Sequence, residues 1–305
     1  MVPAGAVTRF APSPTGYLHL GHVVNAAWVW GVARAAGGRV LLRIEDHDRT
    51  RCRPAYEAAL LDDLEWLGLE PDHPAIASFH AGPSDYRQSD SGAYYETALE
   101  RLRGAGLAYV CECSRKDIAA EVPDRFNEEM RYPGTCRGKG LEPGPGRGWR
   151  VVMAEGSERF HDLRLGAQRQ SPAEQCGDLL VRDRLGNWTY QFAVTVDDLR
   201  HGVNLVIRGE DLIGSTGRQL RLARLLGRTD PPRFLHHPLV LKPSGEKLSK
   251  SSGDTGIREL RAAGLAASSV LGRAAFLGGL LTADRALLPA ELAGRVRAVL
   301  GAYAT

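Results

Sequence analysis

The 305-residue sequence lacks three features that define large classes of proteins. No window approaches the roughly 18 uncharged apolar residues of a membrane-spanning helix, and no long apolar stretch follows a basic N-terminus. The five cysteines are odd in number and the chain has the features of a cytosolic protein, so we expect no disulfide framework. The net charge is only +3, which neither indicates nor excludes a nucleic-acid partner. We therefore expect a cytoplasmic protein with no membrane partner. We also expect a monomer, although none of these features bears on the oligomeric state.

Helix and strand patterns alternate through the first hundred residues. Residues 23–38 have the composition of a helix ended by glycines, and residues 39–46 are a short apolar run whose end presents Glu45. Residues 54–72 and 89–106 have apolar positions at helical spacing. This alternation predicts a doubly wound parallel α/β sheet of the Rossmann type.

The composition changes near Ala108. The chain becomes polar there, and then rich in Gly, Pro and Arg, until apolar runs that resemble strands return over residues 188–212. We therefore expect the first half of a nucleotide-binding domain, an inserted module, the second half of the domain and a helical C-terminal region, at residues 1–106, 107–188, 189–255 and 256–305.

The stretch RFAPSPTGYLHLGH, residues 9–22, lies between the predicted first strand and first helix. Gly21 lets a ligand approach the backbone, and the N-terminus of the following helix attracts an anion. His19 and His22 are three residues apart, so both can donate to phosphate or ribose oxygens from one helical turn. Taken alone, the letters HLGH are better explained by a surface turn with incidental histidines.

A second motif, KLSKS, occupies residues 247–251 in a loop rich in Gly and Ser. Lys247 and Lys250 place two ammonium groups three residues apart. Such a pair can contact a triphosphate and follow its charge as pyrophosphate leaves. By itself the motif is better explained as a solvated basic loop.

Together, the two motifs resemble the signature motifs of class I aminoacyl-tRNA synthetases. Segments such as LLRIEDHDRTR, YVCECSR and TYQFAVTVDDLRHGVNLVIRGEDL are similar to the glutamyl branch of that family and occur in the same order. The resemblance covers roughly residues 7–280. It implies ATP, with Mg²⁺, as a substrate. The ATP-binding or catalytic residues that it implies are His19, Gly21, His22, Lys247 and Lys250.

The region after KLSKS is short. Residues 252–305 are fewer than the helical anticodon-binding region of a glutamyl-tRNA synthetase needs, so the chain resembles the truncated glutamyl-Q tRNA(Asp) synthetases. This resemblance implies activation of L-glutamate without tRNA, then transfer to the queuosine base of tRNA(Asp). Two alternatives stay open. One is a shortened enzyme that charges tRNA(Glu) with a separate partner. The other is a non-catalytic RNA-binding paralogue, against which the intact histidines and lysines argue.

The resemblance also implies a glutamate pocket. Two guanidinium groups suit a dicarboxylate, because each can pair bidentately with a carboxylate. A carboxylate at the end of a strand suits the substrate ammonium, and a tyrosine hydroxyl can donate a hydrogen bond. An alternative is that Arg208 and Glu45 are structural ion-pair partners. The implied residues are Arg9, Ala11, Ser13, Glu45, Tyr190 and Arg208.

Three of the five cysteines cluster in the predicted module. Cys111, Cys113, Tyr132 and Cys136 resemble the zinc site of the same family group, in which a tyrosine supplies the fourth ligand. Zinc prefers thiolates in closed, four-coordinate structural sites, so we expect one structural Zn²⁺ per chain. The interval between Cys113 and Tyr132 is longer than the family pattern and indicates a loop insertion. The alternative is three buried thiols without a metal.

Overall fold

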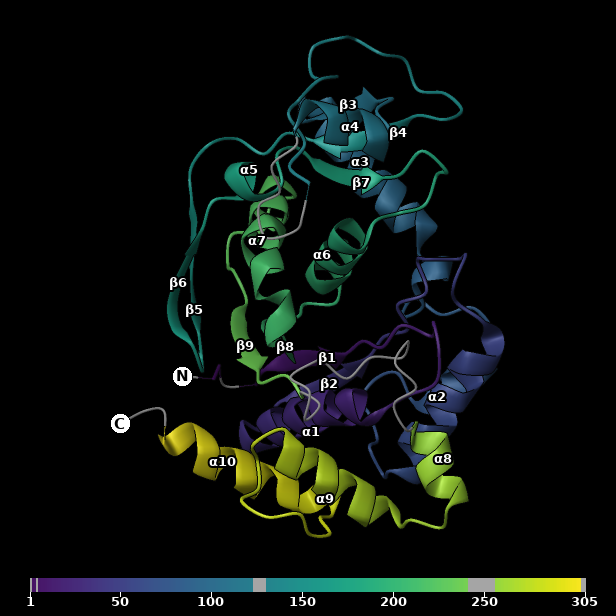
Figure 1. Cartoon of the computed structure of the whole chain (residues 1–305), viewed down its shortest axis with the longest axis vertical. Coiled ribbons are helices and arrows are strands. Elements are labelled where there is room, and N and C mark those ends of the chain that lie inside the picture. The colour runs from purple at the N-terminus through teal and green to yellow at the C-terminus, as the bar shows by residue number, and fades with distance from the viewer. Residues whose placement is uncertain (1, 4, 123–129, 241–255, 303–305) are drawn as a thin grey trace.

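The computed structural model describes the whole chain except residues 1, 4, 123–129, 241–255 and 303–305. A parallel α/β core lies at the centre, with two helices of the C-terminal region below it and a small antiparallel sheet above it (Figure 1). The predicted α/β fold class is therefore confirmed.

Two pairs of parallel strands form the central core. Asn204 links the pairs. Its side-chain oxygen accepts a hydrogen bond from the Val7 backbone amide at 2.8 Å, and its backbone amide donates to the Val7 carbonyl at 3.0 Å. Parallel neighbours require long crossover connections, which helices supply here. The strands are β1 (Val7–Phe10) with β2 (Arg39–Leu42), and β8 (Leu205–Gly209) with β9 (Arg233–His237).

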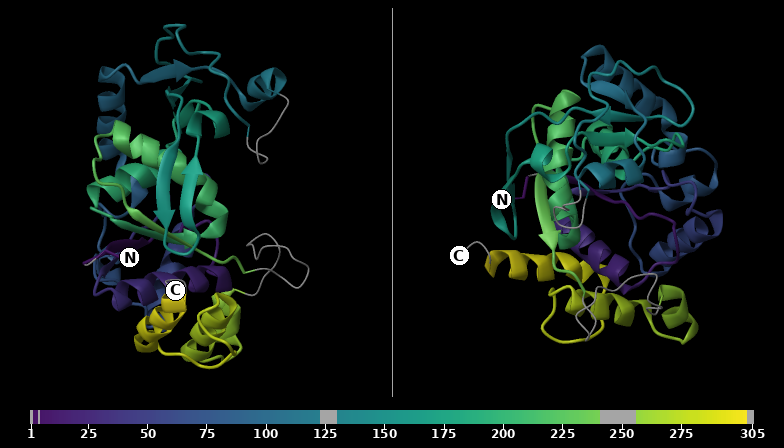
Figure 2. Two further views of the ribbon diagram at one scale, coloured as in Figure 1. Left: turned by 90° about the vertical axis from the view of Figure 1, so that its left-hand side faces the viewer. Right: turned by 45° about the horizontal axis from the view of Figure 1, so that its top comes forward.

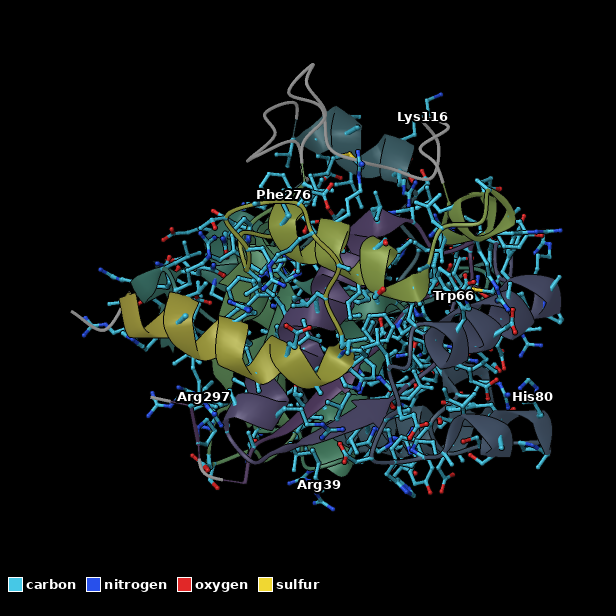
Figure 3. All side chains as sticks on the ribbon, turned by 90° about the horizontal axis from the view of Figure 1, so that it is seen from below. Arg39, Trp66, His80, Lys116, Phe276 and Arg297 are labelled. Atoms are coloured by element: carbon cyan, nitrogen blue, oxygen red, sulfur yellow. The ribbon has the colours of Figure 1, made fainter. Side chains whose placement is uncertain are left out.

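Helix α1 (Leu20–Ala35) crosses the centre of the molecule and is apolar on nearly every side. Strands cover one of its faces, and α9 (Ala267–Leu277) and α10 (Leu292–Ala302) cover the opposite one (Figure 1). Seen from below, the two C-terminal helices lie in front of the core (Figure 3). A Cβ atom at Gly31 would lie 2.5 Å from a Val296 methyl carbon, so the close approach of α1 and α10 requires glycine. Between residues 257 and 302 the C-terminal region is helical, as predicted, apart from residues 263–266 and 278–288.

The upper part of the molecule has its own hydrophobic cluster beneath an antiparallel sheet. The strands of this sheet, in spatial order, are β3 (Ala108–Cys111), β4 (Gly148–Val151) and β7 (Leu179–Arg182). The remaining helices of the N-terminal and upper parts are α2 (Pro54–Trp66), α3 (Gly92–Gly104), α4 (Arg115–Glu121) and α5 (Pro172–Gln175).

A hairpin from residues 158–170 connects the upper part to the core. Its strands β5 (Glu158–Asp162) and β6 (Gly166–Gln170) are antiparallel, and β5 also pairs in parallel with β9 through Asp162 and Phe234. The resulting sheet has the order β6-β5-β9-β8 (Figure 2). The predicted inserted segment thus contributes two strands to the sheet of the second half, and Asp162, the last residue of β5, lies beside Phe234 of β9.

The prediction of strand-like structure over residues 188–212 is wrong for its first half. Residues Tyr190–Arg200 form helix α6, and only β8 is a strand. Helix α6 is buried along seven consecutive residues, 192–198, so its apolar run resembles that of a buried strand.

After α6 come α7 (Thr216–Leu225) and α8 (Ile257–Ala262). Among the described residues, no helix has both the length and the apolar composition to cross a bilayer.

Candidate active site

The two histidines of the first motif cap helix α1 together. The Gly21 amide donates to Nδ1 of His19 at 3.1 Å, and the His19 amide donates to Nδ1 of His22 at 3.1 Å. The ring centroids are 4.0 Å apart, so the predicted placement of both histidines on one turn is confirmed. Because each Nδ1 accepts, each neutral ring carries its proton on Nε2. The helix N-terminus therefore combines two Nε2–H donors with a dipole that favours an anion.

The capping role allows a test that separates folding from ligand binding. Substitution His19→Ala removes the N-cap acceptor and is expected to lower the free energy of unfolding by about 1 kcal/mol. Substitution His19→Asn keeps a capping acceptor and is expected to match the wild type within a few tenths of a kcal/mol. Urea denaturation measures both. If the asparagine variant also keeps full ATP–pyrophosphate exchange, the His19 ring acts only as a cap.

A buried ion network lies at the ends of β1 and β2. Arg43 is fully buried and pairs with Asp198 at 2.8 Å and with Glu45 at 2.9 Å. Arg9 pairs with the same Asp198 at 3.0 Å. Burial opposes ionisation of Asp198, but Arg9 and Arg43 outweigh it and lower its pKa to about 2. Glu45 therefore forms an ion pair inside the protein, as in the alternative that gave it a structural role, but its partner is Arg43.

The sequence analysis missed Arg43 and the acidic pair Asp197 and Asp198. Arg43 lies in an apolar run and is 0% exposed, and Asp197 receives hydrogen bonds from Tyr95 and Gln88. Charged residues inside apolar segments were the available signal, since a buried charge requires a partner.

Arg208 differs from the other buried arginines of the site because its hydrogen-bond acceptors are neutral. Its guanidinium donates to Nε2 of His236 at 3.1 Å, to the Gln219 side chain at 2.7 Å and to the Thr216 hydroxyl at 2.9 Å. Within the described part of the chain, no carboxylate forms an ion pair with it, although it is only 3% exposed. Burial lowers the pKa of Arg208, and the Tyr190 hydroxyl next to it opposes that change. A buried cation of this kind is suited to an anionic ligand.

Tyr190 joins Arg208 to the ion network. Its hydroxyl interacts electrostatically with Arg208, Glu45 and Arg9, and burial raises its pKa. Of the six predicted glutamate-pocket residues, these four therefore gather at one place.

The other two predicted pocket residues lie on the loop between β1 and α1. The Glu45 amide donates to the Pro12 carbonyl at 3.0 Å, which fixes this loop beside β2. Ala11 and Ser13 flank Pro12 and are partly exposed, with the Ser13 hydroxyl 3.8 Å from the Cys52 sulfur. Lys247 and Lys250 fall outside the described residues, so their role remains a prediction.

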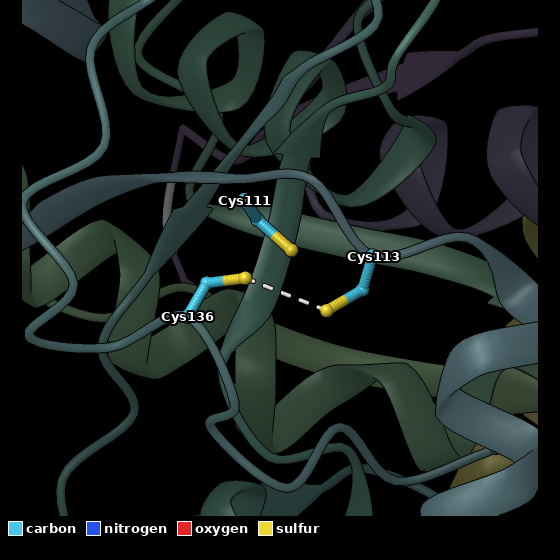
Figure 4. A group of neighbouring side chains, drawn as sticks. All are labelled: Cys111, Cys113 and Cys136. Atoms are coloured by element: carbon cyan, nitrogen blue, oxygen red, sulfur yellow. Dashed lines mark hydrogen bonds between the residues drawn. The ribbon is translucent and has the colours of Figure 1, made fainter.

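The three clustered cysteines converge in the upper part (Figure 4). The sulfurs of Cys111, Cys113 and Cys136 all lie within 4.8 Å of one another, and Cys113 and Cys136 are 3.4 Å apart. The Tyr132 hydroxyl lies 3.4 Å from the Cys111 sulfur and 3.8 Å from the Cys113 sulfur. The structure thus brings all four predicted ligand residues together.

The donor spacing fits a four-coordinate metal. Bonds of about 2.3 Å in a tetrahedral site place neighbouring ligand atoms roughly 3.8 Å apart. The Arg150 guanidinium lies 3.3 Å from the Cys111 sulfur and stacks 3.6 Å from the centroid of the Tyr132 ring. This cation offsets negative charge on deprotonated thiols, so the group of three cysteines can bind a metal ion.

Comparisons with known proteins match this description. The family model for "tRNA synthetases class I (E and Q), catalytic domain" matches residues 6–287. A protein of Burkholderia cenocepacia named "Glutamyl-Q tRNA(Asp) synthetase" is 43% identical over 254 residues, which cover 82% of this chain and 81% of the relative. A protein of Symbiobacterium thermophilum with the same name is 42% identical over 295 residues, covering 93% and 90%.

A solved structure has the same fold. It is a glutamate tRNA ligase from Elizabethkingia meningosepticum in complex with its amino acid, with a TM-score of 0.78 and 28% identity. The match covers 95% of this chain, which spans only 64% of the length of that ligase. From the family match, the identity to these relatives and the shared fold, it follows that this chain belongs to the family of class I tRNA synthetases for glutamate and glutamine.

Proposed function

We propose that this protein activates L-glutamate with ATP and then transfers the glutamyl group to the queuosine base in the anticodon of tRNA(Asp). The buried Arg208, whose hydrogen-bond partners are neutral, carries the activation half of this proposal, because a carboxylate substrate would supply the direct anionic partner that no described residue provides. The names of the relatives support the transfer half.

Activation requires little covalent chemistry from the protein. A carboxylate oxygen of glutamate attacks the α-phosphorus of ATP, one P–O bond forms, and the bond to pyrophosphate breaks. Catalysis then consists of positioning the two substrates and stabilising charge on the phosphates. Arg208 and Tyr190 are suited to hold the glutamate, and the Nε2–H groups of His19 and His22 to hold phosphate oxygens. By resemblance, Arg9 also belongs to the glutamate pocket, although its guanidinium is paired with Asp198. By resemblance, Lys247 and Lys250, with Mg²⁺, stabilise the leaving pyrophosphate.

Transfer follows from the reactivity of glutamyl-adenylate. A hydroxyl of the queuosine base attacks the activated carbonyl and releases its proton to solvent, an ester bond forms, and AMP leaves with the electron pair of the broken anhydride bond. No covalent intermediate on the enzyme is needed. Because ATP, glutamate and tRNA occur together in the cytoplasm, the proposal includes a cytoplasmic enzyme, and we expect it to be monomeric.

The activation half is tested by glutamate-dependent exchange of labelled pyrophosphate into ATP, without tRNA. We expect exchange with L-glutamate and background values with L-glutamine. Exchange that requires added tRNA, or none with glutamate, would contradict the proposal. Exchange that proceeds without tRNA, followed by charging of tRNA(Glu), would support the alternative of a shortened tRNA(Glu)-charging enzyme.

The metal proposed for the upper part is a structural Zn²⁺. Cys111, Cys113, Tyr132 and Cys136 would hold it, and three thiolates with a phenolic oxygen are a donor set that suits zinc. The ion would crosslink β3 to the segment that carries Tyr132, and it takes no part in the chemical steps.

We expect protein purified without chelator to contain about one zinc per chain, measured by mass spectrometry of the metal. Substitution Cys113→Ala removes one thiolate ligand and should lower the zinc content strongly and destabilise the upper part. The matched control is Cys176→Ala, a buried cysteine outside the cluster, which should keep the metal. Wild-type protein without zinc would leave the three thiols as core residues.

A further inference from the structure

A buried chain of three side chains connects the β5–β6 hairpin to Arg208. The Asp162 carboxylate accepts a hydrogen bond from Nδ1 of His236 at 2.7 Å, and Arg208 donates from Nε to Nε2 of His236 at 3.1 Å. We infer that Asp162 and His236 are positioning residues that orient the Arg208 guanidinium toward a carboxylate of bound glutamate. This inference rests on the proposed function, and it assigns a role to a segment that lies outside the sequence motifs.

The protonation state of His236 follows from its two partners. A guanidinium has no acceptor, so Nε2 of His236 must accept and Nδ1 must carry the proton that Asp162 receives. Burial lowers the pKa of His236, although Asp162 opposes that change, and the ring is neutral. A proton on Nε2 instead would direct one N–H group against another. Asp162 therefore fixes the tautomer in which His236 can hold Arg208.

The Asp162 carboxylate is itself held rigidly. One oxygen accepts from the Arg164 and Leu165 amides at 3.0 and 2.9 Å, and the other accepts from the His236 amide at 3.0 Å and from its ring. Burial opposes ionisation of Asp162, but the hydrogen bonds from His236, Leu165 and Arg164 outweigh it and lower its pKa. A fully buried carboxylate with four donors provides a fixed reference point for the imidazole.

The arrangement orients Arg208 without neutralising it by direct contact. The imidazole ring separates the Asp162 carboxylate from the guanidinium, so the two charges are not ion-paired. Three of the five guanidinium N–H groups have neutral acceptors, namely His236, Gln219 and Thr216. Fixed orientation with uncompensated charge is what the recognition of a carboxylate requires. A carboxylate paired directly with Arg208 would instead compete with the substrate.

The same hydrogen bonds also hold the hairpin to β9, so the test needs readouts that a purely structural role would leave unchanged. Substitution His236→Phe keeps a flat ring and removes both ring hydrogen bonds. Substitution His236→Gln retains an amide oxygen that can accept from Arg208. Substitution His161→Gln changes an exposed histidine of β5 in the same chemical way and serves as the matched control.

We expect His236→Phe to raise the KM for glutamate in pyrophosphate exchange by about 10- to 100-fold, with the KM for ATP within about 2-fold of wild type. Calorimetric titration with L-glutamate should show a similar loss of affinity. The glutamine variant should recover part of this loss, and His161→Gln should equal the wild type. Thermal denaturation of each variant shows whether it is folded.

Substitution Asp162→Asn tests the relay independently. It places an amide N–H₂ group where only acceptors fit, so it should also raise the KM for glutamate selectively. If Asp162 acts through His236, the double variant with His236→Phe should be no worse than the more impaired single variant. Should Asp162→Asn fail to fold, the two His236 variants still decide the question.

Equal increases in the KM values for glutamate and ATP would overturn the inference, as would additive effects in the double variant. Unchanged glutamate affinity in His236→Phe would overturn it as well. Failure of the proposed function gives a different result, because wild-type protein would then show no glutamate-dependent exchange.

Discussion

Substitution Arg208→Gln is expected to lower kcat/KM for glutamate in ATP–pyrophosphate exchange by about 100- to 1,000-fold without destabilising the protein. The activity falls because the substrate carboxylate loses a buried, charge-assisted partner. Stability is kept because the wild-type guanidinium is buried against neutral acceptors, and its removal strands no carboxylate. We expect the free energy of unfolding to be unchanged or raised by about 1 kcal/mol, measured by urea denaturation.

The matched control is Arg43→Gln, because Arg43 is also a buried arginine but has acidic partners. Its removal leaves Glu45 and Asp198 with less compensating charge, so we expect a loss of about 3 to 5 kcal/mol in the free energy of unfolding. We therefore expect Arg208→Gln to lower the activity without lowering the free energy of unfolding, and Arg43→Gln to lower the free energy of unfolding. Comparable destabilisation by both substitutions would show that Arg208 is a structural residue.

The glutamyl group is expected to be transferred to tRNA(Asp) only when the tRNA carries queuosine. Labelling of queuosine-free tRNA(Asp) should fall to background, because the proposed acceptor hydroxyl is then absent. Sequence-specific RNA recognition favours anticodon loops, whose unstacked bases can be read on their edges. The measurement is acid-precipitable label from radioactive glutamate with paired preparations of tRNA(Asp), with and without the modification.

A control separates the base from the 3′ end of the tRNA. Queuosine-containing tRNA(Asp) whose terminal adenosine has been removed enzymatically should still accept glutamate. This treatment avoids periodate, which can also attack the diol of the modified base. Labelling that requires the terminal adenosine and ignores queuosine would instead identify an enzyme that charges the 3′ end.

The local sequence determined the first helix and its histidine pair. Gly21 and the spacing of His19 and His22 specify a helix N-terminus with both rings on one turn, because capping depends only on residues within that turn. The alternation of apolar segments likewise determined the parallel α/β core. The cysteine spacing indicated a cluster, since Cys111 and Cys113 are local neighbours and Cys136 follows soon after.

Tertiary structure alone decided how buried charges are distributed. Arg9, Arg43 and Arg208 are the same residue type, but the packing of helix α6 brings Asp198 to the first two, while Thr216, Gln219 and His236 surround the third. These contacts join residues up to 189 positions apart, as in Arg9 and Asp198, so no local pattern encodes them. Asp162 is the clearest case, because its position beside His236 arises only when the hairpin pairs with β9. The sequence thus determined which chemical groups are present. The fold decided which arginine is buried without a carboxylate partner and can therefore pair with a ligand.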